Sequence, residues 1–161
     1  MNKDVKIVTD TCNFKFRVCG IVCIDDKILT VQMHNNGFYC LPGGHVELGE
    51  DTESAILREM KEELGYSVRI TKLIAIVENF FNGKNNKAFH ELGFYYMVEP
   101  INKNDLRLDN YTIIENDKGE NIKLEFKWIS YTDLKETNFK PSFLKDKLAN
   151  KNYDFAHYII K

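Results

Sequence analysis

The chain has 161 residues, a formal net charge of −2 and a hydrophobic content of 43%, which together predict one ordinary globular domain over residues 1–161. A charge near neutrality, with a pI near 6.1, excludes a global basic field for nucleic acid or for a membrane surface. No apolar run approaches the roughly 20 residues of a membrane span, and the first residues lack an apolar signal core, so we expect a cytosolic protein.

The first predicted elements form a hairpin. Residues 14–24 alternate between the two faces of a strand, with Val18 and Val22 on one face and Arg17 on the other. The turn at residues 25–27 leads into a second strand at residues 28–33. A further turn at residues 35–37 is expected to lead into a short strand at residues 38–41, directly before Pro42 and a pair of glycines.

Four cysteines stand at positions 12, 19, 23 and 40. Cys19 and Cys23 lie on the same predicted strand, ~13 Å apart along it, which is too far for a disulfide. No histidine stands at zinc-site spacing from them. We therefore expect reduced and mostly buried thiols.

The second half of the chain is predicted to contain three strands. Residues 67–81 and 88–99 are strand-like and are joined by a polar turn at residues 82–86. Residues 100–118 are polar, apart from a short apolar segment at residues 111–114, and are predicted to form a long loop. Residues 122–130, which include Trp128, form the third strand.

A short helix is expected near the end of the chain. Pro141 fits a first helical position, and Phe143, Leu144 and Leu148 would form its apolar side. The lysine-rich segment 135–151 also contains acidic residues and is read as an ordinary amphipathic helix. Strands on both sides of a long central helix, with this second helix, predict an α+β fold: an α/β/α sandwich with a mixed sheet.

The central helix is bounded by clear signals. Gly43-Gly44 allow a tight turn before it. Asp51 is a candidate cap, with Ser54 nearby, and acidic residues at 50–53 suit a helix start. No glycine or proline interrupts Glu53–Leu64, and Gly65 follows as a stop.

Two faces of this helix differ in chemistry. At about 100° per residue, one arc is apolar and predicted to be buried; it contains Ile56, Leu57, Met60 and Leu64. The adjacent arc brings together Glu59, Glu62 and Glu63, with Ala55 leaving space above them. On an exposed face such acids repel by only ~0.2–0.5 kcal/mol per pair, whereas beside a buried edge the repulsion reaches roughly 3 kcal/mol. A divalent cation removes that repulsion, and oxygen ligands suit Mg²⁺ or Mn²⁺ rather than zinc.

Residues 44–66 carry a fixed spacing of seven positions, which are Gly44, Glu50, Arg58, Glu59, Glu62, Glu63 and Gly65. Seven specified positions would match by chance in a chain of this length on the order of once in a million. The stretch resembles the signature of the Nudix (MutT-type) hydrolases, G-x5-E-x7-R-E-U-x-E-E-x-G-U, where U is aliphatic. Tyr66, which is not aliphatic, is the one departure. The segments HELGFYY and EFKWIS and the proline-led last helix are also similar to bacterial members of the family.

The resemblance implies a three-layer sandwich in which the signature forms a loop–helix–loop. It also implies hydrolysis of a nucleoside diphosphate linked to another group, with Mg²⁺ or Mn²⁺. The implied metal ligands are Glu59, Glu62 and Glu63, with the backbone carbonyl of Gly43 completing the site. Arg58 and Glu50 are expected to form a structural pair that holds the loop against the helix.

Several roles stay open. The carboxylate that takes the proton of the attacking water is Glu59 or a remote residue, Glu120 or Glu125. Glu47 is a metal ligand, a base or merely exposed. Arg17 reaches a substrate phosphate or lies at a solvated edge. We group Arg17, Glu47 and Glu125 as candidate substrate-binding residues, and Glu50, Arg58, Glu59 and Glu62 as the catalytic set.

The substrate is the least determined property. Aromatic residues could stack on a base or belong to the core; they are Phe80, Phe81, Tyr95, Tyr96 and Tyr111. Phe81 replaces the proline that marks many ADP-ribose enzymes of the family. Residues 82–84 lack the tyrosine of dinucleoside-tetraphosphate enzymes. The expected partner is a small-molecule nucleotide, first a nucleoside triphosphate, oxidised or not, and second ADP-ribose.

Two alternatives to this enzyme are a binding domain and an RNA cap hydrolase. A Nudix-like domain that senses a nucleotide without cleaving it typically loses signature glutamates, and all of them are present here. An RNA cap hydrolase would require a basic surface that follows the RNA. Neither nucleic acid nor a membrane is an expected partner, and a homodimer is one possibility for the assembly.

Overall fold

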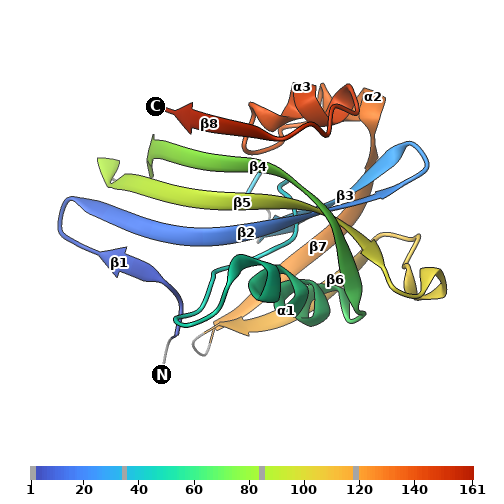
Figure 1. The fold of residues 1–161 in the computed structure, drawn as a ribbon, viewed down its shortest axis with the longest axis horizontal. Coiled ribbons are helices and arrows are strands. Elements are labelled where there is room, and N and C mark those ends of the chain that lie inside the picture. The colour runs from blue at the N-terminus through green and yellow to red at the C-terminus, as the bar shows by residue number, and fades with distance from the viewer. Residues whose placement is uncertain (1–2, 34–35, 84–85, 118–119) are drawn as a thin grey trace.

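The computed structural model describes residues 3–33, 36–83, 86–117 and 120–161. Its strands form one mixed sheet in the order β6-β7-β3-β2-β5-β4-β8, with β1 paired to β2 (Figure 1). The strands are β1 Lys6–Val8, β2 Cys12–Ile24, β3 Lys27–Met33, β4 Val68–Asn82, β5 Ala88–Pro100, β6 Tyr111–Asp117, β7 Glu120–Ser130 and β8 Ala156–Ile160. The helices are α1 Thr52–Leu64, α2 Tyr131–Leu134, α3 Leu144–Ala149 and the 3₁₀ turn η2 Lys103–Asp105.

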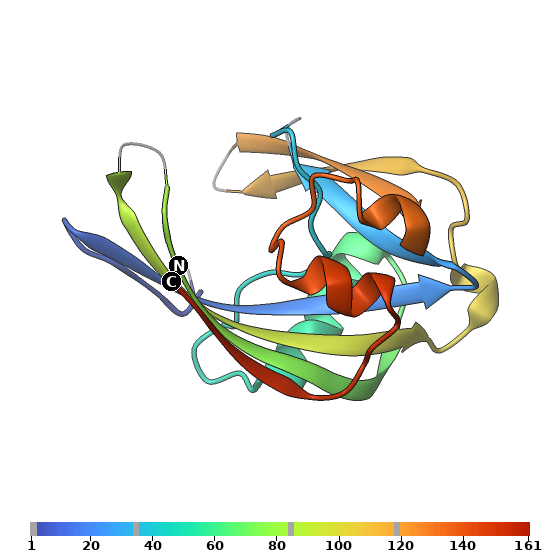
Figure 2. The same ribbon diagram turned by 90° about the horizontal axis from the view of Figure 1, so that it is seen from above.

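Helices cover both sides of the sheet (Figure 2). The helix α1 packs with one core, which contains Val18 and Val22. The helices α2 and α3 pack with a second core, which contains Ile21. All three side chains belong to β2. One strand contributes to both cores because successive residues of a strand point to opposite faces of the sheet. The predicted α+β sandwich with a mixed sheet is confirmed.

Strand β2 also positions the loop that precedes α1. Its partner on one side is β5, parallel along most of its length, whereas β3 pairs with it only at its end. The loop takes the remaining edge: Val18 N donates to Gly44 O at 3.0 Å, Gly20 N donates to Pro42 O at 2.9 Å, and Val46 N donates to Phe16 O at 3.0 Å. The loop is therefore attached to the sheet like a short extra strand.

Helix α1 begins and ends where the sequence predicts. The Asp51 side chain accepts a hydrogen bond from Ser54 N, and Gly65 adopts the left-handed conformation at the C-terminus, with φ of 79°. The predicted apolar arc is wrong at Leu57, which is 39% exposed. Ala55 is fully buried instead, so it belongs to the packed side of the helix and leaves no open space above the carboxylates.

The predicted long loop at residues 100–118 is wrong over much of its length. It contains η2 and the strand β6, which pairs antiparallel with β7 from Tyr111 onward. The second half of β6 is polar, and an edge strand tolerates polar residues because it meets solvent. Lys118 lies outside the described residues.

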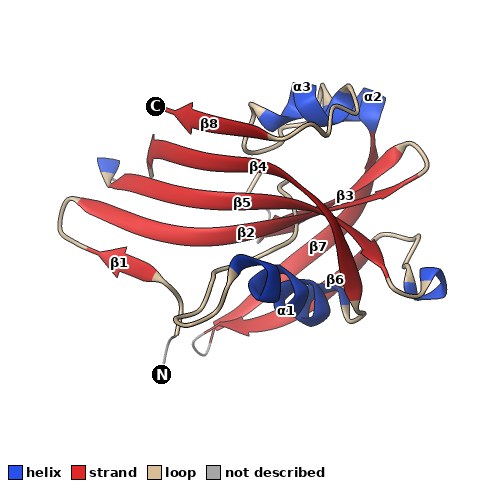
Figure 3. Cartoon of the chain, in the orientation of Figure 1, coloured by secondary structure: helices blue, strands red, loops and turns tan. Residues whose placement is uncertain are grey.

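Short elements account for the other differences (Figure 3). The predicted strand at residues 38–41 is reduced to isolated bridges at Tyr39 and Cys40. The last helix begins at Leu144, so Pro141 precedes it rather than opening it, and the helical part of segment 135–151 is confined to α3. The strands β1 and β8 and the helix α2 were not predicted, because each is too short for a periodic pattern.

The hairpin of β2 and β3 and the long strands β4, β5 and β7 confirm the sequence predictions. In the turns predicted at residues 35–37 and 82–86, Asn35, Lys84 and Asn85 lie outside the described residues. The four cysteines form no disulfide and are partly buried. In the described ranges, no helix combines the length and the apolar character needed to cross a bilayer.

Candidate metal and phosphate site

Gly43 is held through both of its backbone polar groups. Its N–H donates to Glu63 Oε2 at 3.0 Å, and its carbonyl accepts from Arg17 Nη2 at 3.1 Å. The φ of Gly43 is +140°, and a Cβ at this position would lie 2.2 Å from Val18 O. Only glycine fits a backbone so close to the neighbouring strand, so the direction of the Gly43 carbonyl is fixed by packing.

Glu59 and Glu63 lie one turn apart on α1, beside the backbone of Gly43 and Gly44. Each is only 9% exposed. A Cβ at Gly44 would lie 2.3 Å from the Glu59 carboxylate, so that carboxylate rests directly against the loop backbone. Burial, followed by repulsion from Glu59, raises the pKa of Glu63 to about 8. Burial also raises the pKa of Glu59, against the opposing effect of Arg58.

Arg58 joins the loop to the helix through its whole guanidinium group. Its Nε and Nη2 each donate at 2.9 Å to the two oxygens of Glu50, which is a bidentate pair. Nη2 also donates to His45 O at 2.9 Å, and Nη1 donates to Glu59 Oε1 at 2.8 Å. These hydrogen bonds hold the pKa of Glu50 below its ordinary value. The predicted contact between Arg58 and Glu50 is present.

Negative charge exceeds positive charge in this network. Arg58 is shared by three carboxylates, those of Glu50, Glu59 and Glu62. Glu63 adds a fourth, and Arg17 supplies the second cation through the Gly43 peptide. The network thus has a deficit of two positive charges when every carboxylate is ionised, which one divalent cation would cancel.

Glu62 departs from the other two carboxylates of its arc. Its side chain is 56% exposed, and its contact is with Arg58 Nη1 at 3.2 Å. The angular position of Glu62 on α1 turns it past the edge of the core toward solvent. The sequence prediction that three carboxylates converge beside the core is therefore met by Glu59 and Glu63, while Glu62 stands at the rim.

The remaining candidate residues are spread over the molecule. Glu47 is on the signature loop, where its backbone N–H donates to Glu50 Oε2 and its carboxylate lies 3.8 Å from Lys3. Glu125 is on β7 and pairs with Lys123 of the same strand. The side chain of Glu120 lies outside the described part of the chain. Of the residues grouped for substrate binding, Arg17 alone contacts Gly43.

Sequence reasoning did not single out His45. It forms a bridge across from Arg17, and burial followed by the charge of Arg17 lowers its pKa to about 4. Three buried polar atoms around this part of β2 have no hydrogen-bond partner in the described structure: Asn13 Oδ1, Arg17 Nε and His45 Nε2. Unpartnered buried polar atoms are uncommon in folded proteins, and they mark this side of β2 as a place for a polar ligand.

The candidate stacking aromatics separate into two groups. Tyr95 and Tyr96 are buried in the cores, and Tyr111 stacks on Phe126 with ring centroids 4.7 Å apart. Phe80 and Phe81 are partly exposed at the far end of β4 and stack on side chains of β5. Core packing therefore accounts for the first group.

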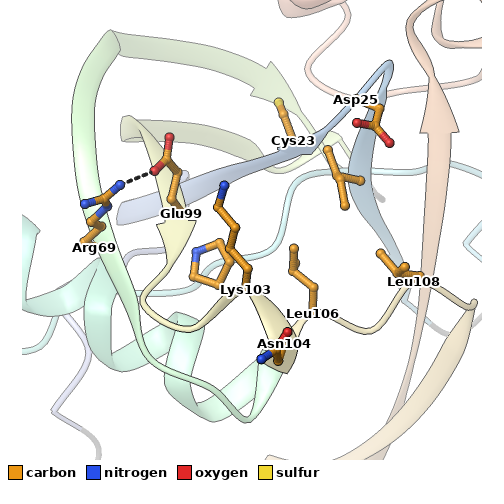
Figure 4. Close-up of a pocket in the computed structure, with 10 residues that line it drawn as sticks. Cys23, Asp25, Arg69, Glu99, Lys103, Asn104, Leu106 and Leu108 are labelled. Atoms are coloured by element: carbon orange, nitrogen blue, oxygen red, sulfur yellow. Dashed lines mark hydrogen bonds and ion pairs between the residues drawn. The ribbon is translucent and has the colours of Figure 1, made fainter.

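A cavity of about 690 Å³ lies elsewhere, at the opposite end of β2 (Figure 4). Its lining includes Cys23, Asp25 and Lys103, together with the ion pair between Arg69 and Glu99. The signature loop contacts β2 at residues 16–20 instead. The cavity is therefore separate from the carboxylate network.

The donor set beside Gly43 fits a hard divalent cation. Two carboxylates and a fixed carbonyl supply oxygen ligands only, as Mg²⁺ and Mn²⁺ prefer. Within the described ranges, no three His, Cys, Asp or Glu side chains gather closely enough to hold a metal by themselves. A metal here would thus depend on the backbone carbonyl, and on water or substrate oxygens, to complete its coordination.

The chain matches the NUDIX domain family over residues 14–148. An ADP-ribose pyrophosphatase of Methanocaldococcus jannaschii is 44% identical over 62 residues, which cover 37% of each chain. A MutT-like protein of Streptomyces ambofaciens is 36% identical over 67 residues, covering 41% of this chain and 44% of the relative. This chain thus spans less than half the length of these curated relatives. The solved structure of a MutT protein from Bacillus halodurans superposes with a TM-score of 0.59 at 15% identity, covering 91% and 90% of the two chains.

Proposed function

Because this chain belongs to the NUDIX domain family, we propose that it hydrolyses a phosphoanhydride bond in a nucleoside diphosphate linked to another group. The observation that carries the proposal is the buried pair Glu59 and Glu63, which lies against the backbone of Gly43 and Gly44 in a network with too little positive charge. Buried carboxylates without compensating charge are unfavourable. A divalent cation, Mg²⁺ or Mn²⁺, would neutralise the excess negative charge of this arrangement.

Glu59, Glu63 and the Gly43 carbonyl would hold the metal, and Glu62 would reach it from the rim through water. When bound, the metal supplies charge stabilisation for the transferring phosphate oxygens and lowers the pKa of its water. Arg58 donates to Glu59 Oε1 and would thereby hold this carboxylate in one orientation. Glu50 keeps Arg58 in place through two hydrogen bonds.

Proton removal from the attacking water falls to a carboxylate of the same network. Glu59 is favoured, since it lies against the loop and its pKa is raised by burial. Glu125 is the weaker candidate, since its partner is Lys123 on the other half of the sheet. We expect an alkaline optimum, because both a metal-bound water and an acidic cluster lose protons more readily at higher pH.

The names of the relatives and the chemistry of the site both support the proposed substrate class. One relative bears the name ADP-ribose pyrophosphatase and another the name MutT-like. Both ADP-ribose and a nucleoside triphosphate, oxidised or not, contain the linked diphosphate that the proposal requires. We further propose a cytosolic enzyme of one domain over residues 1–161, with a homodimer as one possible assembly.

The test is a panel of nucleotides incubated with the full chain and Mg²⁺ or Mn²⁺, with identification of the products. The expected products are a nucleoside monophosphate together with pyrophosphate or a phosphorylated second group. The matched control is Glu63→Gln, which removes one proposed metal ligand. Tight binding of a nucleotide without any turnover by the wild type would instead identify a sensing domain.

A further inference from the structure

Arg17 contacts the same carbonyl that the proposed metal would use. Its Nη2 lies 3.1 Å from Gly43 O, and its buried Nε has no hydrogen-bond partner in the described residues. An arginine remains protonated at any relevant pH. A permanent positive charge is therefore built into the edge of the proposed metal site.

The Gly43 carbonyl is held in place by the surrounding backbone. The Gly43 backbone is packed against Val18 O and is held by Glu63 through its N–H. The adjoining backbone hydrogen bonds of Gly20 to Pro42 and of Val18 to Gly44 fix the loop on both sides. A carbonyl oxygen has two lone pairs and can accept from Arg17 while it binds a cation. The two charges would then share one oxygen.

Arg17 belongs to the same network as the proposed ligands. Glu63 accepts from the Gly43 N–H, the Gly43 carbonyl accepts from Arg17, and Arg58 contacts Glu59. In the protein without metal, Arg17 thus supplies part of the positive charge that these buried carboxylates lack. The same charge must repel a divalent cation that enters the site.

We propose that the charge of Arg17 stands in for part of the metal's charge and thereby weakens metal binding by the signature loop. This inference rests on the proposed function, since it requires that the Gly43 carbonyl and the two carboxylates hold a cation. Because the loop is held by β2 and by Glu63 as well, loss of Arg17 would leave the ligands in place. Neutral substitution of Arg17 should therefore tighten metal binding.

The experiment is a titration of the metal-free full chain with Mn²⁺, in the absence of nucleotide, followed by calorimetry or by the electron paramagnetic resonance of free Mn²⁺. Arg17 carries a single charge, and a cation on the same Gly43 oxygen would carry a double charge. At that separation their repulsion corresponds to on the order of a tenfold change in affinity, even at a nearly aqueous dielectric. We expect Arg17→Gln to lower the Kd for Mn²⁺ by about tenfold. Arg17→Lys keeps the charge and should stay within about threefold of the wild type.

Lys15 provides the matched control for a general charge effect. It stands two residues away on the same face of β2, with its Nζ over the Phe89 ring. We expect Lys15→Gln to change the Kd by less than about threefold, because its ammonium group lies over the Phe89 ring rather than on the Gly43 carbonyl. Circular dichroism checks the fold of each variant, and Arg17→Met carries the same prediction if Arg17→Gln is not folded.

The outcomes separate the two proposals. Unchanged or weaker Mn²⁺ binding by Arg17→Gln, or equal tightening by Lys15→Gln, would overturn the role of Arg17 while leaving the metal site intact. A wild-type protein that binds no Mn²⁺ would overturn the metal site itself. Tighter binding by Arg17→Gln, with Arg17→Lys close to the wild type, would support both.

Discussion

Two arginine–glutamate pairs of this protein use the same chemistry in different surroundings. Arg58 and Glu50 join the signature loop to α1, with side chains 26% and 16% exposed. Arg69 and Glu99 join β4 to β5 beside the separate cavity, with side chains 68% and 50% exposed (Figure 4). The exposed pair has the shorter single contact, 2.7 Å against 2.9 Å.

Distance is therefore a poor guide to what each pair contributes. Water and salt screen the exposed pair, and such pairs contribute ~0–1 kcal/mol. The signature pair makes two parallel hydrogen bonds, and Arg58 also serves His45 O and Glu59. Loss of one partner there leaves polar groups without compensation in a partly buried site. The two pairs differ in burial and in the number of groups that share the arginine. Four experiments test this difference and the buried site to which Arg58 belongs.

The largest effect is expected from Glu63→Gln. Glutamine keeps an acceptor for the Gly43 N–H but removes a buried negative charge that the metal needs. We expect turnover to fall on the order of 10²–10³-fold and Mn²⁺ binding to be lost, while the melting temperature of the metal-free protein holds or rises. Activity assays, calorimetry and thermal unfolding measure these three quantities. Wild-type turnover in this variant would remove Glu63 from the metal site.

Arg58→Ala should lower both stability and activity. Glu50, Glu59 and the His45 carbonyl lose their shared donor, which we expect to cost about 2–3 kcal/mol of the free energy of unfolding. For a domain of this size that is roughly 5–10 °C in melting temperature. Chemical denaturation and thermal unfolding give both values. A fall in activity with unchanged stability would mean that Arg58 acts on the substrate instead.

The pH dependence of stability should reveal the buried carboxylate. The pKa of Glu63 is raised from its ordinary value of 4.5 to about 8, so the folded state binds this proton more tightly than the unfolded state does. Its contribution to stability is complete below pH 4.5 and is lost as the pH rises through about 8. We expect the melting temperature of the metal-free protein to decline over this range, and the decline to be smaller in Glu63→Gln. An identical profile in the two proteins would contradict the assignment.

Arg69→Ala should have the smallest effect. The pair is exposed on both sides, so we expect a change below about 0.5 kcal/mol, which 0.5 M salt reduces further. Denaturant unfolding at two salt concentrations measures it, beside Arg58→Ala under the same conditions. A loss as large as that of Arg58→Ala would show that burial does not separate the two pairs.

The sequence by itself determined the parts of the protein that depend on local order. The cap at Asp51, the uninterrupted run to Leu64 and the stop at Gly65 specify α1, because backbone hydrogen bonding and capping act within a few residues. The alternation in β2 and the length of β4 and β5 were visible for the same reason. The contact between Glu50 of the loop and Arg58 of the helix was expected because the two residues occupy fixed positions of the Nudix signature.

Tertiary structure decided which of these residues are buried and what they meet. Periodicity placed Leu57 in the core and grouped Glu62 with Glu59 and Glu63, but the orientation of α1 on the sheet exposes Leu57 and Glu62. The strand β8 forms because a partner far away in the sequence, β4, satisfies its backbone groups. The contact of Arg17 with Gly43 joins residues 26 positions apart. No local pattern encodes such a contact, because the docking of the loop along β2 creates it.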